Sequence, residues 1–189
     1  MTFRWRSVAL AAGLTASLGA AAAPRDDTAA APYFPELGPH IMRVGRYEDA
    51  AEANRKAIAA EKAYVEKAQP KGFHWMYVAH NPQFLMAAAM MEGRRAEALS
   101  AAREATGYLS PEMLRQMPGY DFSLVYPQWV QVRFGGWDEV LAEPAPPDDL
   151  RFAKAMWHAA CGIASAARSR PDEAETERRG SPRASASRA

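Results

Sequence analysis

The pattern of apolar and polar positions between residues 37 and 57 predicts two short helices folded back on each other. Ile41 and Val44 place apolar groups on one side of a helical turn, and Gly45 then provides a hinge. After the hinge, Tyr47 and several alanines recur near the 3.6-residue period of an α-helix, while glutamates and an arginine occupy the other face. The small alanines would let the second helix lie close to the first.

The same pattern returns twice. The segment GRRAEALSAAREA, from Gly93 to Ala105, repeats the hinge and the spaced alanines, and GGWDEVL, from Gly135 to Leu141, repeats the hinge with Trp137 in the aromatic position. A lone helical hairpin cannot bury its apolar face, so a recurring hairpin pattern predicts stacked helix pairs.

These residues resemble the tetratricopeptide repeat (TPR) family, whose pattern of a W-x2-L-G-x2-Y segment followed by spaced alanines, phenylalanine and proline spans 34 residues. The first copy matches at Leu37, Gly38, Ile41, Gly45, Tyr47, Ala50 and Ala57, and the second at Leu85, Ala89, Gly93, Ala98 and Ala105. The third matches only from Gly135 to Val140, and a candidate fourth rests on Gly162 and Ala174. Successive hinges are 48 and 42 residues apart, so the repeats would be divergent, with long connections.

The resemblance implies an all-α fold over residues 37–167, a TPR-like superhelix of α-α hairpins forming a short α-solenoid. It also implies that the first helix of each pair lines a concave groove, which would hold a protein or peptide partner. Carrying over the groove positions gives Met42, Arg43, His80, Gln83, Ala87, Met90 and Met91. Because no polar capping helix is evident at either end, the chain resembles a shortened member of a longer family.

The two ends of the chain differ from its middle. Residues 1–23 combine Arg4 and Arg6, an apolar run and small residues, which is typical of a cleaved export signal; the alternative is a membrane anchor, but a bilayer span needs about 20 strongly apolar residues. We therefore expect an exported protein, periplasmic or secreted, with no stable membrane insertion after cleavage. Residues 24–36 are rich in proline and predict an extended linker, and residues 168–189 contain no large apolar residue and predict a disordered tail.

Several element boundaries follow from local signals. Asn81 followed by Pro82 predicts the start of a helix, and Ser110 followed by proline predicts one short capped turn. A helix is expected to begin either near residue 122 or near Pro127; the alternation in VQVRF would also suit a strand, but the following GGWDEVL favours helix. Asp148 is expected to cap a last helix whose apolar face holds Phe152, Met156, Ala160 and Ile163.

Charge argues against a nucleic-acid partner. The whole chain has a formal net charge of +1, but residues 24–167 carry 15 Lys or Arg against 18 Asp or Glu. A mildly acidic folded part lacks the basic surface that nucleic-acid binding requires.

Candidate chemistry is sparse. Cys161 is the only cysteine, and its apolar neighbours predict a buried thiol. The four histidines, His40, His74, His80 and His158, form no i, i+4 pair and no HExxH pattern, so we expect no metal and no cofactor. The expected function is therefore a non-catalytic protein–protein interaction module. The alternative is a metal-binding or enzymatic helical protein that uses His40, His74 and His80.

An aromatic run, Phe73, His74, Trp75, Tyr77 and His80, precedes the second hairpin. Trp and Tyr are enriched at binding hot spots, so the run could form a recognition surface. The favoured interpretation is that these rings fill the space between widely spaced repeats.

Overall fold

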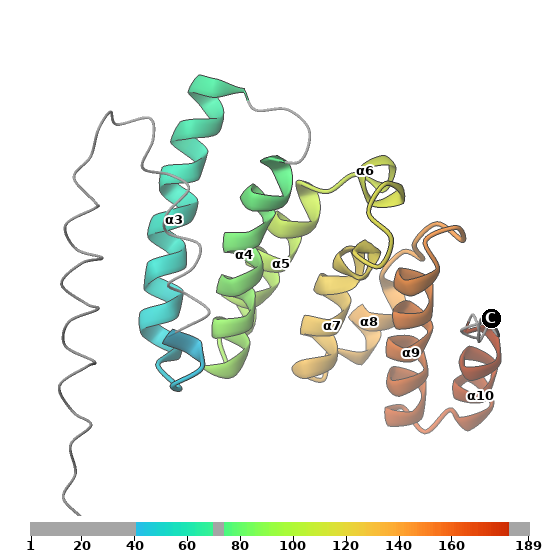
Figure 1. Ribbon diagram of the computed structural model, residues 1–189. Helices are drawn as coiled ribbons and strands as arrows, with labels where there is room; N and C mark the ends of the chain where they lie inside the picture. The colour runs from blue at the N-terminus through green and yellow to red at the C-terminus, as the bar shows by residue number, and fades with distance from the viewer. Residues whose placement is uncertain (1–40, 70–73, 182–189) are drawn as a thin grey trace, which may run out of the picture.

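The computed structural model describes residues 41–69 and 74–181, which form helices and connections without a strand (Figure 1). The expected all-α class is confirmed for this part of the chain. The expected signal (1–23), the linker (24–36) and residues 182–189 lie outside the described residues. The elements are α3 (Tyr47–Ala68), α4 (His74–Met91), α5 (Arg95–Gly107), α6 (Pro111–Arg115), the 3-10 helix η2 (Asp121–Val125), α7 (Tyr126–Arg133), α8 (Trp137–Ala142), α9 (Arg151–Ala167) and α10 (Pro171–Gly180).

Four turns of one kind join the helix pairs, and they lie at the same end of the array, at the bottom of Figure 1. The residue at the centre of each turn has a positive φ: 78° at Gly45, 76° at Gly93, 71° at Gly135 and 58° at Ser169. In each turn, the N–H of the next residue bonds to the carbonyl five positions earlier, as Arg94 does with Ala89 at 2.9 Å. This is the Schellman arrangement, which closes one helix and lets the next begin at once.

The predicted hinges at the three glycines are confirmed, because glycine adopts a positive φ without strain. The fourth turn differs from the expectation. It is centred on Ser169, whereas Gly162 lies within α9, where an added Cβ would lie 3.6 Å from Glu177 Cβ of α10.

We call the helices that precede a turn (α4, α7 and α9) the leading helices, and those that follow a turn (α3, α5, α8 and α10) the following helices. Each hairpin is covered by the leading helix of the next one. Leu85 and Ala88 of α4 pack against α3, Tyr126 and Val130 of α7 against α5, and Ala160 and Ala164 of α9 against Val140 of α8. The core is therefore a series of small clusters along the row of helices.

Ion pairs connect each hairpin to the next through the following helices. From α3, Arg55 pairs with Glu97 of α5 at 2.7 Å, and Glu48 pairs with Arg94 at the start of α5 at 2.5 Å. From α5, Arg95 pairs with Glu139 and Arg103 with Glu143, and from α8, Asp138 pairs with Arg168. The acidic residues Glu48, Glu97, Asp138 and Glu139 lie in first helical turns, where the helix dipole stabilises negative charge, and they also join neighbouring hairpins.

Two predicted helix starts are wrong. Asn81 and Pro82 lie inside α4, which begins at His74, so the proline occupies a helix interior and leaves the carbonyl of Val78 without its usual N–H partner. At α9 the cap is not Asp148. Instead Oδ2 of the buried Asp121 accepts the backbone N–H groups of Phe152 and Ala153, each at 2.9 Å.

The other boundaries agree more closely. Ser110 caps α6 by accepting the N–H of Met113, and the segment around Pro127 is helical, with η2 leading directly into α7. The predicted disordered tail is wrong over residues 171–180, which form α10 against α9. Small residues allow this close packing, and His158 Nδ1 lies 2.6 Å from Glu177 Oε2 across the two helices.

Candidate interaction surface

One stripe of α4 holds four of the seven predicted groove residues. His80, Gln83, Ala87 and Met91 are spaced by three or four positions, so they share one side of the helix. The first three are partly exposed and Met91 is 54% exposed. The His80 ring packs against Phe84 with the ring centroids 4.5 Å apart. The sequence of α4 contains no charged residue, so its exposed stripe is apolar and weakly polar.

The other three predicted residues do not share this surface. Met42 is half-buried and packs with Ile41 and Met86 against the first core cluster. Arg43 is exposed beside the first turn and makes no ion pair within the part of the chain that is described. Met90 packs toward α7 on the second cluster. The structure therefore places four of the predicted residues, those on the α4 stripe, on one surface. Met42 and Met90 instead pack against the core clusters.

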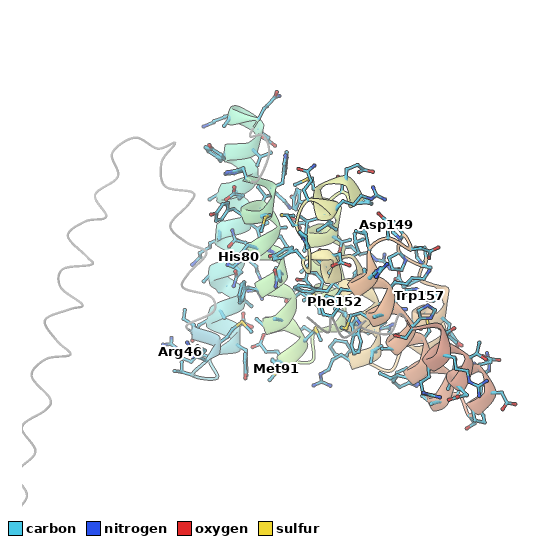
Figure 2. The ribbon with its side chains drawn as sticks, turned by 45° about the vertical axis from the view of Figure 1, so that its right-hand side comes forward. Arg46, His80, Met91, Asp149, Phe152 and Trp157 are labelled. Carbon is cyan, nitrogen blue, oxygen red and sulfur yellow. The ribbon has the colours of Figure 1, made fainter. Side chains whose placement is uncertain are left out.

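The exposed large apolar side chains lie on helices or segments that precede a turn. The large apolar side chains exposed in the described residues all belong to a leading helix or to the segment just before Gly45: Val44, Tyr77, Met91, Phe152 and Ile163. Phe152 and Ile163 were expected on the buried face of the last helix, but they are 48% and 41% exposed. Figure 2 shows Phe152 at the start of α9, with His80 and Met91 on α4.

Apolar contacts connect α4 with α9. Phe122 of η2 packs on the cluster that also receives Met86 and Met90, and its ring meets the Phe152 ring with centroids 5.8 Å apart. Sequence reasoning missed Phe152 as a surface residue because an apolar residue at helical spacing normally indicates a core position.

The aromatic run mostly packs inward. Trp75 stacks on Tyr108 with centroids 5.9 Å apart, and His74 Nε2 lies 2.9 Å from Oε1 of the buried Glu61 on α3. Burial and the nearby Glu104 raise the pKa of Tyr108 to about 12. Tyr77 is 64% exposed and His80 is partly exposed. His74 and Trp75 thus pack among α3, α4 and α5, while Phe73 lies outside the described residues.

Two of the three histidines of the alternative function are described, and they have different partners: His74 bonds to Glu61, and His80 packs against Phe84. His40 lies outside the described residues. Within residues 41–69 and 74–181, no group of three or more His, Cys, Asp or Glu is placed to hold a metal ion.

Cys161 is a buried thiol, as predicted. Gln128 Nε2 lies 3.4 Å from its Sγ, and burial raises the pKa of the thiol to about 11. The protonated thiol is a poor nucleophile, because the thiolate is the reactive form.

The α9–α10 hairpin carries a surface groove away from the predicted site. Two adjoining cavities of about 620 Å³ and 450 Å³ share Ala166, Ala174 and Arg178 in their walls. No residue predicted to contact a partner lines either cavity.

Searches of protein-family models, curated proteins and solved structures find no match to this chain. Among the helices of the described residues, none combines the length and apolar character needed to cross a membrane.

Proposed function

We propose that this chain is a non-catalytic protein–protein interaction module, an exported TPR-like α-solenoid that binds a peptide or protein segment along its leading helices. The observation that carries the proposal is the distribution of side chains between the two sets of helices. The leading helices expose Tyr77, Met91, Phe152 and Ile163, whereas the following helices carry the ion pairs between hairpins.

Physical reasoning supports a partner on this surface. Exposed apolar side chains grouped on one surface are costly in water, and such patches on soluble proteins commonly serve as interaction sites. The stripe from Tyr77 to Met91 extends about 21 Å along α4, at 1.5 Å for each residue. That length suits a short peptide whose apolar side chains repeat along one edge.

The charges of the leading helices also limit the partner's charge. The charged residues of the leading helices are Arg133, Arg151 and Lys154, and none is acidic. Lys154 pairs with Asp148, while Arg133 and Arg151 make no ion pair within the described residues. A partner that is apolar and not cationic meets this surface without charge repulsion.

Peptide-display selection on the purified chain, followed by affinity measurement with the selected peptide, tests the proposal. Replacing Tyr77 and Met91 together by serine should weaken binding about tenfold or more, because apolar anchors carry most of the energy of such contacts. The double change His80→Ala with Gln83→Ala should also weaken binding of the same peptide, because both residues lie at the centre of the stripe.

Lys56→Ser on α3 is the matched control, because Lys56 is exposed on a following helix. The control should leave the affinity unchanged. If peptide affinity fell equally in the control and in the Tyr77 and Met91 variant, or fell in neither, the leading helices would be excluded as the binding surface.

A further inference from the structure

The C-terminal hairpin leaves open a groove that is filled in the other hairpins. Ala174 of α10 occupies the fifth position after its turn residue, as Ala50, Ala98 and Val140 do in α3, α5 and α8. Those three are 0% exposed, whereas Ala174 is partly exposed and lines the α9–α10 cavities. Each of the three is covered by the leading helix of the next hairpin. The described residues provide no such helix for Ala174.

The first hairpin shows the complementary feature. Val44, directly before Gly45, is 71% exposed. The residue at the same position in the third turn is Phe134, which packs against a cluster shared by α4, α5 and α7. Val44 is the exposed counterpart of Phe134 at the first turn.

The ion pairs between hairpins indicate which charges should meet if another hairpin were added. An acid three positions after a turn residue meets an arginine of the next turn, as Glu48 meets Arg94 and Asp138 meets Arg168. An arginine ten positions after a turn residue meets a glutamate of the next hairpin: Arg55 meets Glu97, four residues after Gly93. Arg103 likewise meets Glu143, which directly follows α8.

Both positions recur in α10. Asp172 lies three positions after Ser169, and its carboxylate makes no ion pair in the part of the chain that is described. Arg179 lies ten positions after Ser169, and it pairs only with Glu175 of its own helix. At the other end of the array, Arg46 and Asp49 hold the positions of Arg94 and Glu97, and they pair with each other.

We propose that a second copy of this chain docks head to tail, with the start of its α3, from Arg46 to Asp49, against the α9–α10 groove. Asp172 then meets Arg46 of the second copy, and Arg179 meets Asp49 of the second copy, as Glu48 meets Arg94 and Arg55 meets Glu97 at the first junction within one chain. The contact joins two different surfaces, so repeated association gives a ring or a filament rather than a twofold dimer. It uses the ends of the array. Ile163 lines the α9–α10 groove, whereas Tyr77, Met91 and Phe152 lie outside it, so their part of the leading helices stays open to a peptide.

Sedimentation velocity of the full chain over a range of concentrations tests the contact. We expect concentration-dependent species heavier than one chain. Asp172→Arg or Arg46→Asp alone should weaken association about tenfold, because each change places like charges opposite each other at the junction. An equimolar mixture of the two single variants should regain association, since each reversed end then meets a complementary one.

Glu66→Arg and Lys67→Asp are the matched controls, because both residues are exposed on α3 and make no ion pair within the described residues. They should leave association unchanged. Ala174→Trp fills the groove and should abolish association while leaving the circular dichroism spectrum intact. A single-chain mass at every concentration, association that survives Ala174→Trp, or a mixture that fails to recover would each overturn the proposal.

Discussion

Replacing Gly93 by alanine isolates the free-energy cost of the left-handed turn. Gly93 has φ of 76°, and a Cβ added there would meet no atom within 4 Å, so the substitution changes backbone conformational energy without a clash. The left-handed conformation costs an L-residue about 1–2 kcal/mol, and the stiffer unfolded chain returns about 0.4–1 kcal/mol. The expected net loss is about 1 kcal/mol of unfolding free energy.

Gly107→Ala provides the matched control. Gly107 ends α5 without a positive φ, and a Cβ added there also meets nothing within 4 Å. Alanine should stabilise this helix by about 0.5 kcal/mol, because glycine loses more conformational freedom on folding. Urea unfolding followed by circular dichroism measures both variants. If the unfolding free energy changed in the same direction in both variants, the left-handed turn at Gly93 would not be what disfavours alanine there.

Three further variants or measurements test individual contacts. Ser169→Gly should raise the melting temperature, since serine holds φ of 58° in the fourth turn; an unchanged or lower value in calorimetry would contradict the strain assigned there. Asp121→Ala should lower the unfolding free energy by about 2 kcal/mol by removing the acceptor for two N–H groups of α9, and a loss below about 0.5 kcal/mol in urea unfolding would argue against the cap. Cys161 should react with a thiol reagent at pH 8 only when urea unfolds the chain, because burial raises its pKa to about 11, and rapid labelling of the native chain would disprove that burial.

Local signals in the sequence predicted the features that depend on local chemistry. Gly45, Gly93 and Gly135 were predictable hinges because a positive φ favours glycine, and Ser110 was a predictable cap because its hydroxyl reaches an N–H three residues ahead. Burial of Cys161 followed from its apolar neighbours.

The missed features depend on residues that are distant in sequence. The cap of α9 is supplied by Asp121, 31 positions before Phe152, and no local pattern reveals that pairing. The fourth turn uses Ser169, which carries no glycine signal. Pro82 indicates a helix start because a proline inside a helix is unfavourable, yet α4 continues through it and packs against both α3 and α5. Local patterns also could not distinguish the exposed Phe152 from a core residue.

Helix α10 has no buried residue, and this determines where local unfolding of the described helices begins. In a quasi-one-dimensional row, each helix pair is stabilised mainly by its neighbours, so the pair with the least interface has the lowest opening free energy. Amide hydrogens of α10 therefore exchange with solvent before those of α9, while the alanine-lined centre of α5 exchanges late. Among the described helices of a single chain, α10 is therefore expected to fray before α9 and to be cut earlier by a protease.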